Sequence, residues 1–201
     1  KRNNDTCSLG DWKVNYDKLP SGIDGLAEKI NKIGMKFGLW FEPEMISPDS
    51  DLYREHPDWA IHIDEREGVQ SRNQMVLDLS RDEVCEYVIN AVSDILANAN
   101  IEYVKWDMNR QLTDMPRLGY NHEYTLGYYK IMSAITEKFP NILFEGCSAG
   151  GGRFDAGVLA YMPQIWTSDN SDAIARLKMQ YSTSMCYPVY SISSHVTASP
   201  N

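Results

Sequence analysis

The sequence has 201 residues, of which 43% are hydrophobic and 23% are charged, an ordinary globular composition that suits one domain. Its net charge of -9 argues against nucleic acids and anionic membrane surfaces as partners, because both require a basic protein face. No apolar run reaches the roughly 20 residues that a membrane-spanning helix needs.

The four cysteines, Cys7, Cys85, Cys147 and Cys186, lie far apart and form no C-x-x-C pair. This pattern predicts reduced thiols in a cytosolic protein, so we expect a cytoplasmic location. The ligand spacing of a zinc site is also absent, and neither a metal nor a cofactor is expected.

The first predicted elements are a helix, a strand and a loop. Apolar residues at helical spacing predict a helix over residues 23–33, which Gly34 ends. A strand is expected over 36–44, closed by Pro43, and residues 47–59 should form a loop with one helical turn.

The clearest helix covers residues 81–100, where Ser80 suits the N-cap and Glu83 stands three residues further on, as in a capping box. Strands and helices then alternate to the end of the chain. The remaining predicted strands are 101–109, 141–150, 164–170 and 189–196, and the helices between them are 122–139, 153–162 and 171–186.

Repeated strand-then-helix units predict an α/β fold with a parallel sheet covered by helices. An open doubly wound sheet and a (β/α)8 TIM-type barrel both satisfy this pattern. A nucleotide-binding fold is less well supported, because no G-x-G-x-x-G opens a helix and AGGGRF lacks the Lys-Ser/Thr of a P-loop. A barrel gathers functional residues at the carboxyl ends of its strands, where this chain has Glu42, Glu44, Asp107, Glu145, Cys147, Asp169 and His195.

The number of strands predicts an incomplete barrel. A complete one has eight strands and about 250 residues, whereas about five β/α units are predicted here. The chain also opens at Lys1 without a cap and closes in a loop-like stretch at Asn201. We therefore expect residues 1–201 to be one partial catalytic domain of a larger enzyme, supplying roughly strands three to seven.

Two acids follow predicted strands, Asp107 in KWDMN and Asp169 in WTSDN, and could face each other across the mouth of a barrel. Glycoside hydrolysis needs two carboxylates, one to attack or activate water and one to protonate the leaving oxygen. Lys105 should share a face with Asp107 and favour its ionised form, while Trp106 points into the core. The alternative is that each aspartate caps a helix or forms a salt bridge.

Other candidates surround these acids. The glycine-rich stretch GCSAGGGRFD (146–155) could let backbone approach a ligand, or could simply be a tight turn. Trp40 could stack on a sugar or be packed, and Arg72 could anchor a hydroxyl or pair with an acid. A metallohydrolase using Glu42, Glu44 and His195 is weakened because the four histidines form no known metal motif.

Five motifs in order, GLWFEPE, SRNQ, KWDMNR, CSAGGGRFD and WTSDNSD, resemble the bacterial and plant α-galactosidases of glycoside hydrolase family 36. The resemblance implies a (β/α)8 barrel between an N-terminal β-sandwich and a C-terminal β-domain. It implies retaining hydrolysis of terminal α-linked galactose from raffinose- or melibiose-type oligosaccharides by a homo-oligomer without a cofactor. Asp107 would be the nucleophile and Asp169 the general acid/base. The galactose-binding residues would be Trp40, Arg72, Lys105, Asn109, Cys147 and Gly150.

The chain departs from the family pattern in three places. The family's Asp-Asp-Gly-Trp strand end would lie before residue 1, Gly146 and Ala149 stand where Ser and Gly are frequent, and the stretch between Asp107 and Cys147 is short. Three rival interpretations remain open: a galactosyltransferase of the raffinose or stachyose synthase type, a catalytically inactive fragment, and a carbohydrate-binding module. Retention predicts carboxyl groups about 5–5.5 Å apart.

Overall fold

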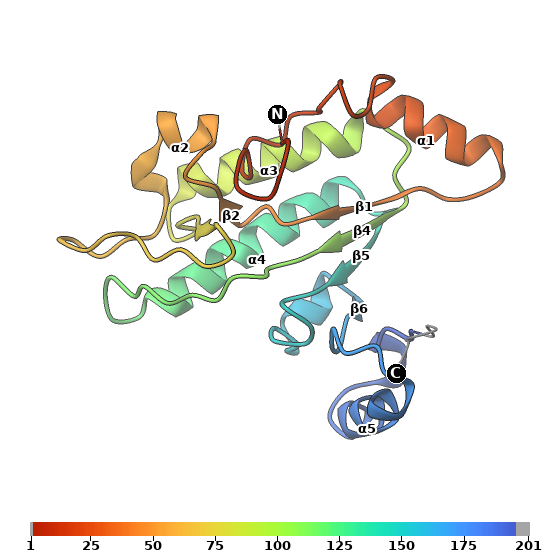
Figure 1. Ribbon diagram of the computed structural model, residues 1–201. Coiled ribbons are helices and arrows are strands. Elements are labelled where there is room, and N and C mark those ends of the chain that lie inside the picture. Colours follow the sequence, from red (N-terminus) through yellow and green to blue (C-terminus); the bar gives the residue numbers. More distant parts are fainter. Residues whose placement is uncertain (1, 196–201) are drawn as a thin grey trace.

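The computed structural model describes residues 2–195 and contains a four-stranded parallel sheet in the order β1-β4-β5-β6 (Figure 1). These strands are Gly38–Phe41, Tyr103–Trp106, Leu143–Gly146 and Gln164–Ile165. The predicted α/β fold with a parallel sheet is therefore confirmed. Among residues 2–195, no helix is both long and apolar enough to cross a membrane.

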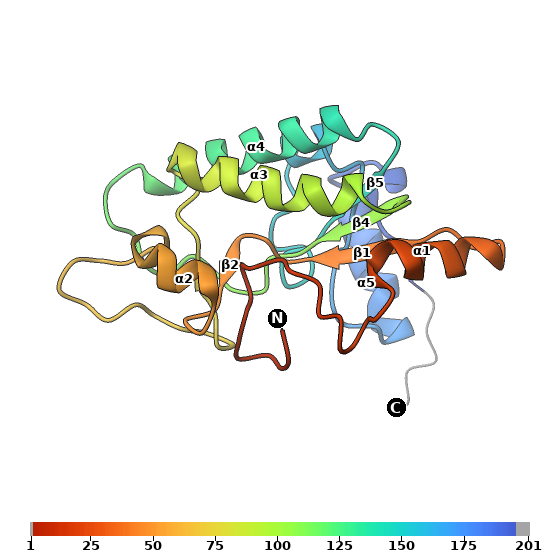
Figure 2. The same cartoon turned by 90° about the horizontal axis from the view of Figure 1, so that it is seen from above.

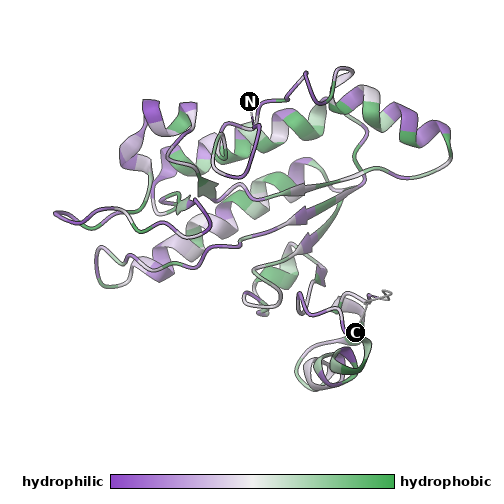
Figure 3. Ribbon diagram, viewed as in Figure 1, coloured by the Kyte–Doolittle hydropathy of each residue, from purple (hydrophilic) through white to green (hydrophobic). Residues whose placement is uncertain are grey.

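Helices α3 (Asp82–Ala97) and α4 (Tyr120–Lys138) pack side by side on one face of the sheet, as Figure 2 shows from above. Figure 3 shows hydrophobic residues recurring along both helices between hydrophilic ones, as expected of helices with one buried face. Helix α1 (Gly22–Lys32) precedes β1 in the chain, and α5 (Ala173–Ser184) follows β6. Parallel strands need such crossovers, which explains the alternation in the sequence.

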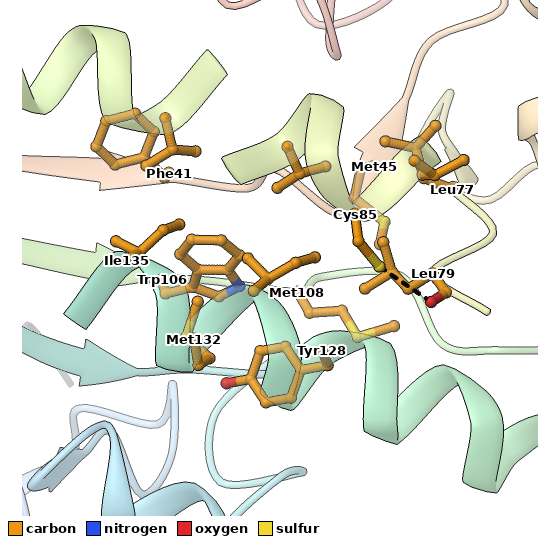
Figure 4. Close-up of a cluster of buried hydrophobic side chains, with 14 of the residues drawn as sticks. Phe41, Met45, Leu77, Leu79, Cys85, Trp106, Met108, Tyr128, Met132 and Ile135 are labelled. Atoms are coloured by element: carbon orange, nitrogen blue, oxygen red, sulfur yellow. Dashed lines mark hydrogen bonds between the residues drawn. The ribbon is translucent and has the colours of Figure 1, made fainter. Parts of the chain in front are cut away.

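The core lies between the sheet and helices α3 and α4. Trp106 is fully buried and meets the ring of Tyr128 at a centroid distance of 6.5 Å, with Met132 and Ile135 of α4 nearby (Figure 4). The prediction that Trp106 points into the core is therefore confirmed. Full burial of each large side chain stabilises the fold by about 1.5–3 kcal/mol.

Several predicted boundaries were wrong. Ser80 does not cap α3, because its hydroxyl donates to Asp78 Oδ1 at 2.6 Å, and Arg81 holds the N-cap position without a side-chain hydrogen bond. The predicted helix 153–162 is reduced to a 3-10 turn, η2 (Val158–Ala160), since three glycines precede it. Asp172 does cap α5, accepting from the N–H of Ala175 at 2.7 Å.

The last predicted strand, 189–196, was also wrong. It begins with a 3-10 turn, η3 (Val189–Ser191), after which Ile192 alone forms a parallel bridge with Ile165. Residue 196 lies outside the described residues. The turn follows Pro188, whose carbonyl accepts from the N–H of Ser191, so the chain is bent where an extended strand was expected.

An antiparallel pair was missed entirely. Strands β2 (Met45–Ile46) and β3 (Met75–Val76) pair with each other, and the chain between them includes α2 (Asp51–Glu55) and the 3-10 turn η1 (Pro57–Trp59). Two-residue strands give no alternating pattern in the sequence, which is why this pair could not be predicted.

A buried ion pair joins the segment after β1 to the glycine-rich loop. Glu44 is fully buried, and Arg153 donates to both of its carboxylate oxygens at 2.7 and 2.9 Å. Trp106 Nε1 and the hydroxyl of Tyr124 complete the set of donors to Glu44, at 2.8 and 2.7 Å. The pair thereby fixes the loop over the end of the sheet.

Arg153→Met is expected to lower the free energy of unfolding by about 3–5 kcal/mol, because it leaves the Glu44 carboxylate buried without its cation. Thermal unfolding of the full-length protein measures the effect, and Glu44→Gln combined with Arg153→Met should recover part of it. Arg54→Met is the matched control, since Arg54 pairs with Asp49 and Asp51 at the surface and should matter little. Equal shifts for Arg153→Met and Arg54→Met would contradict this account.

Candidate active site

The four parallel strands end at one edge of the sheet, and the residues that follow them there are Glu42, Asp107, Cys147 and Trp166. The register aligns Phe41 with Trp106, Trp106 with Gly146 and Gly146 with Ile165, so all four residues follow directly on aligned partners. Parallel strands carry their functional groups at this edge in α/β enzymes.

Asp107 is held in one orientation at the end of β4. Its side chain is 6% exposed, and Oδ2 accepts hydrogen bonds from Trp40 Nε1 at 3.0 Å and from Asn109 Nδ2 at 2.7 Å. Oδ1 accepts from the N–H of Met108 at 2.8 Å. Trp40 and Asn109, both predicted site residues, therefore meet at this carboxylate.

Lys105 shares the strand face of Asp107, but its ion-pair partner is Glu145. Lys105 Nζ lies 3.2 Å from Glu145 Oε1 and 4.0 Å from the centre of the Trp166 ring. Burial raises the pKa of Glu145, but hydrogen bonds from Ser193 and Gln164 and the charge of Lys105 outweigh it and leave that pKa lowered. The prediction of Lys105 as the charge partner of Asp107 was therefore wrong in its choice of carboxylate.

Cys147 is buried beside Asp107. Burial raises the pKa of its thiol to about 12; the N–H of Gly150 opposes this rise, and the charge and hydrogen bond of Asp107 add to it. The thiol is therefore neutral and acts as a hydrogen-bond donor. All four cysteines lie within the described residues and are unpaired, as predicted.

Gly150 brings the glycine-rich loop against the segment that leads to Asp169. It has a φ of +91°, and a Cβ there would lie 3.0 Å from Ser168 Cα and 3.3 Å from the backbone N of Asp169. Only glycine combines this conformation with this approach. The loop and the Asp169 segment are thus packed backbone to backbone.

Gly150→Ala is expected to destabilise the protein by more than the roughly 1–2 kcal/mol that a left-handed residue costs, because the added Cβ would also lie too close to Ser168 Cα. Gly34→Ala is the matched control, since Gly34 has a φ of +81° and open space around it. Thermal unfolding of both variants isolates the steric part. Equal losses would show that the packing of Gly150 against Ser168 contributes nothing.

Asp169 lies exposed in the loop after β6, and its Oδ1 accepts a hydrogen bond from Trp166 Nε1 at 2.9 Å. The Trp166 ring contacts Lys105 and also the guanidinium of Arg176, whose carbon lies 4.4 Å from the ring centre. Arg176 in turn donates to Thr167 Oγ1 and to the carbonyl of Ser168 at 2.9 and 2.7 Å. Trp166 therefore links Asp169 to the Lys105 face of β4.

Arg72 lies at the tip of a hairpin turn. Ser71 and Gln74 exchange backbone hydrogen bonds of 3.0 and 3.1 Å, and both Arg72 and Asn73 between them have positive φ. The Arg72 side chain is exposed and has no ion pair within residues 2–195. The structure thus brings together Trp40, Lys105, Asp107, Asn109, Cys147 and Gly150, and within residues 2–195 Arg72 has no hydrogen bond or ion pair with any of them.

The residues proposed for a metal do not converge. Glu44 is bound by Arg153, Glu42 by Asn109 and Gln74, and His195 packs edge-on against Trp166 at 4.9 Å. Within the described part of the chain, no group of three or more metal-binding side chains occurs.

The profile of the Melibiase family matches residues 1–201, the whole chain. The chain belongs to the Melibiase family. Its relatives include α-galactosidase AgaA of Geobacillus stearothermophilus, 54% identical over 209 aligned residues that cover 100% of this chain and 29% of AgaA. Alpha-galactosidase C of Emericella nidulans is 46% identical, covering 100% of this chain and 28% of that protein.

Solved structures of this family are similar in both sequence and fold. The crystal structure of the GH36 α-galactosidase AgaB from Geobacillus stearothermophilus has a TM-score of 0.96 and 55% identity, covering 100% of this chain and 29% of that one. A variant of AgaA from the same organism in complex with raffinose has a TM-score of 0.96 and 54% identity, with the same coverage. The Melibiase-family chain described here thus spans about 29% of the length of these relatives.

Four contacts of this Melibiase-family site were not predicted from the sequence: those of Glu42, Arg153, Trp166 and Arg176. Glu42 was identified as an acid at a strand end, but its hydrogen bonds with Asn109 and Gln74 were not predicted, and Trp166 lies within the predicted strand 164–170. No sequence pattern indicated the contacts of Arg153 and Arg176. The partner of Arg153 lies 109 residues away, and the partners of Arg176 lie 9 and 8 residues away, in the loop before its helix.

Proposed function

We propose that this chain is the central part of the catalytic domain of a retaining α-galactosidase. Residues 1–201 would supply about five β/α units, strands three to seven, of a (β/α)8 barrel. The observation that carries the proposal is the buried Asp107 carboxylate at the end of β4, held by Trp40 and Asn109. Within the described residues β1 pairs only with β4, which agrees with a sheet that continues beyond this chain.

In the first step, an oxygen of Asp107 attacks the anomeric carbon of a terminal α-linked galactose. The glycosidic C–O bond breaks, and Asp169 protonates the leaving oxygen. In the second step, Asp169 removes a proton from water, which displaces Asp107 and releases galactose with the α configuration.

The surroundings of the two acids suit these roles. Three N–H donors orient Asp107, so its reactive oxygens do not have to be arranged during the reaction. Asp169 lies exposed in a loop, where it can exchange protons with water and contact a leaving group of variable structure. Retention requires the two carboxyl groups to be about 5–5.5 Å apart.

The sugar would be bound by Trp40, Arg72, Lys105, Asn109, Cys147 and Gly150. Trp40 is 46% exposed although its N–H is bound to Asp107, so a ring face remains for a sugar. Raffinose- or melibiose-type oligosaccharides are the proposed substrates, in agreement with the raffinose complex of the related AgaA variant. The full-length protein would act as a homo-oligomer without a cofactor.

Product analysis of the full-length protein tests this proposal. Incubated with raffinose and followed by proton NMR, it should release α-galactose before mutarotation, at the same rate with or without excess acceptor sugar. Release of β-galactose would overturn the retaining mechanism. Transfer of most galactose to the acceptor would identify a synthase. No turnover of any α-galactoside would reject the proposal that the protein is an enzyme acting on α-galactosides.

A further inference from the structure

Residues 71–74 form a tight hairpin turn with Arg72 and Asn73 at its tip. Ser71 bridges Gln74 across this turn, whereas Ala60 bridges Leu77 in a different register, and a separate turn, in which the N–H of Arg66 donates to the carbonyl of Ile63, lies between Ala60 and Ser71. In Figure 1 the chain between α2 and β3, which contains this turn, extends beyond the carboxyl ends of the strands, near the loop between β4 and α4. That loop, residues 107–119, begins with the proposed nucleophile.

The β4–α4 loop holds the chain that leads into this hairpin at Val69. Arg110 donates from Nη2 to the carbonyl of Val69, and Asp114 Oδ2 accepts from the N–H of Val69 at 3.4 Å. Arg110 also donates from Nη1 to the carbonyl of Gln111. Both peptide groups of Val69 are therefore fixed by the loop that carries Asp107.

Glu42 holds the other arm. Its Oε2 accepts from Gln74 Nε2 at 3.0 Å and its Oε1 accepts from the N–H of Asn109 at 2.9 Å. Burial raises the pKa of Glu42, and the hydrogen bonds from Asn109 and Gln74 offset the rise only in part. The hairpin is thus tied to the 107–119 loop on both sides of its tip.

A buried arginine such as Arg110 is an unusual residue for holding two segments together through carbonyl groups. Its side chain is 2% exposed, its Nε is buried without a partner, and its two other donors go to carbonyl groups instead of a carboxylate. Burial lowers its pKa, although the charge of Asp114 opposes this. Burying a charge in this way opposes folding, so stability alone does not explain why an arginine stands here.

The tip of the hairpin is strained as well. Arg72 has a φ of 56° and Asn73 a φ of 59°, the left-handed pair of a type I′ turn. Asn and Gly suit these positions, whereas an arginine there is disfavoured. A disfavoured conformation of an exposed arginine is typical of a functional position.

We propose that Arg110 is a positioning residue that sets substrate affinity through Arg72, by fixing the hairpin at Val69. This inference rests on the proposed function, in which Arg72 binds the substrate. Arg110 contacts neither Asp107 nor Asn109 by a hydrogen bond, so the chemical step itself does not depend on it.

Kinetics of the full-length protein with an aryl α-galactoside test the inference by a double-mutant cycle. Arg110→Met should raise KM by about tenfold to a hundredfold with kcat nearly unchanged, because the hairpin tip is displaced. Arg72→Asn, which keeps the turn conformation, should raise KM similarly. Because both act through one contact, the double variant should be no worse than Arg72→Asn alone.

Controls separate this role from general damage to the fold. Arg117→Met removes an exposed arginine of the same loop that pairs with Glu123, and should leave KM unchanged. Arg110→Lys, which reaches one carbonyl at most, should fall between wild type and Arg110→Met. Additive effects of Arg110→Met and Arg72→Asn, or a loss of kcat without a change in KM, would overturn the inference.

Hydrogen exchange gives a readout that does not depend on activity. The Val69 amide should exchange faster in Arg110→Met than in wild type or Arg117→Met, whatever the substrate is. Unchanged exchange of the Val69 amide would contradict the claim that Arg110 fixes the chain at Val69. Faster exchange in a wild-type protein that turns over no α-galactoside would instead reject the proposed function and leave the tie intact.

Discussion

Replacing Asp107 with glycine is expected to reduce kcat for α-galactosides by a factor on the order of 10⁴ or more, as removal of a nucleophile does. The covalent intermediate cannot form without the carboxylate, and its donors Trp40 and Asn109 would remain in place around an empty position. The measurement is initial-rate kinetics of the full-length variant with an activated aryl α-galactoside.

Azide should rescue this variant by occupying the space of the lost carboxylate. A single displacement by azide from the face that Asp107 uses gives β-galactosyl azide, which NMR distinguishes from the α-anomer. Asp64→Gly is the matched control, because the Asp64 side chain is fully exposed, and it should retain wild-type rates. Wild-type activity of Asp107→Gly would reject Asp107 as the nucleophile.

The sheet could be predicted because its strands are short, apolar and separated by amphipathic helices. The burial of Trp106 followed from strand alternation, since Lys105 and Asp107 flank it on the opposite face. The β2–β3 pair could not be predicted, because each strand has two residues and thirty residues, including α2 and η1, separate Met45 from Val76. Local patterns record neighbours along the chain and miss such pairings.

The same limit applies to the site. Motif order and strand ends directed attention to Asp107 and Asp169, because parallel strands place these ends at one edge. The choice of partner for Lys105 depended on which strand lies beside β4, and Glu145 of β5 faces it across the register. Asp107, two positions from Lys105 in the sequence, was the predicted partner, but Glu145 on the neighbouring strand supplies the carboxylate.

Trp166 shows what the fold adds to a motif. In the sequence it is the first residue of WTSDN, one more aromatic residue in a predicted strand. In the structure its ring lies against Lys105 and Arg176, and its N–H is bound to Asp169. It therefore orients the proposed acid and packs against the proposed sugar-binding lysine, two functions that no local pattern indicates.

Replacing Asp169 with alanine is expected to have an effect that depends on the leaving group. For raffinose, whose leaving oxygen needs a proton, kcat/KM should fall by about 10²–10⁴, the contribution of general acid catalysis. For a dinitrophenyl α-galactoside, whose leaving group needs no proton, kcat/KM should stay close to wild type. Its kcat should fall, because no base remains to activate water in the second step, and KM should fall with it.

Azide should restore kcat of Asp169→Ala and give α-galactosyl azide, the anomer opposite to that from Asp107→Gly, because here azide attacks the covalent intermediate. Asp172→Asn is the matched control: asparagine also serves as an N-cap for α5, so both substrates should react at wild-type rates. Equal losses of kcat/KM for raffinose and the dinitrophenyl galactoside would contradict the acid role, since a merely structural aspartate cannot distinguish leaving groups. Opposite anomers from the two variants would instead require that Asp107 and Asp169 act on opposite faces of one galactose, as a retaining mechanism needs.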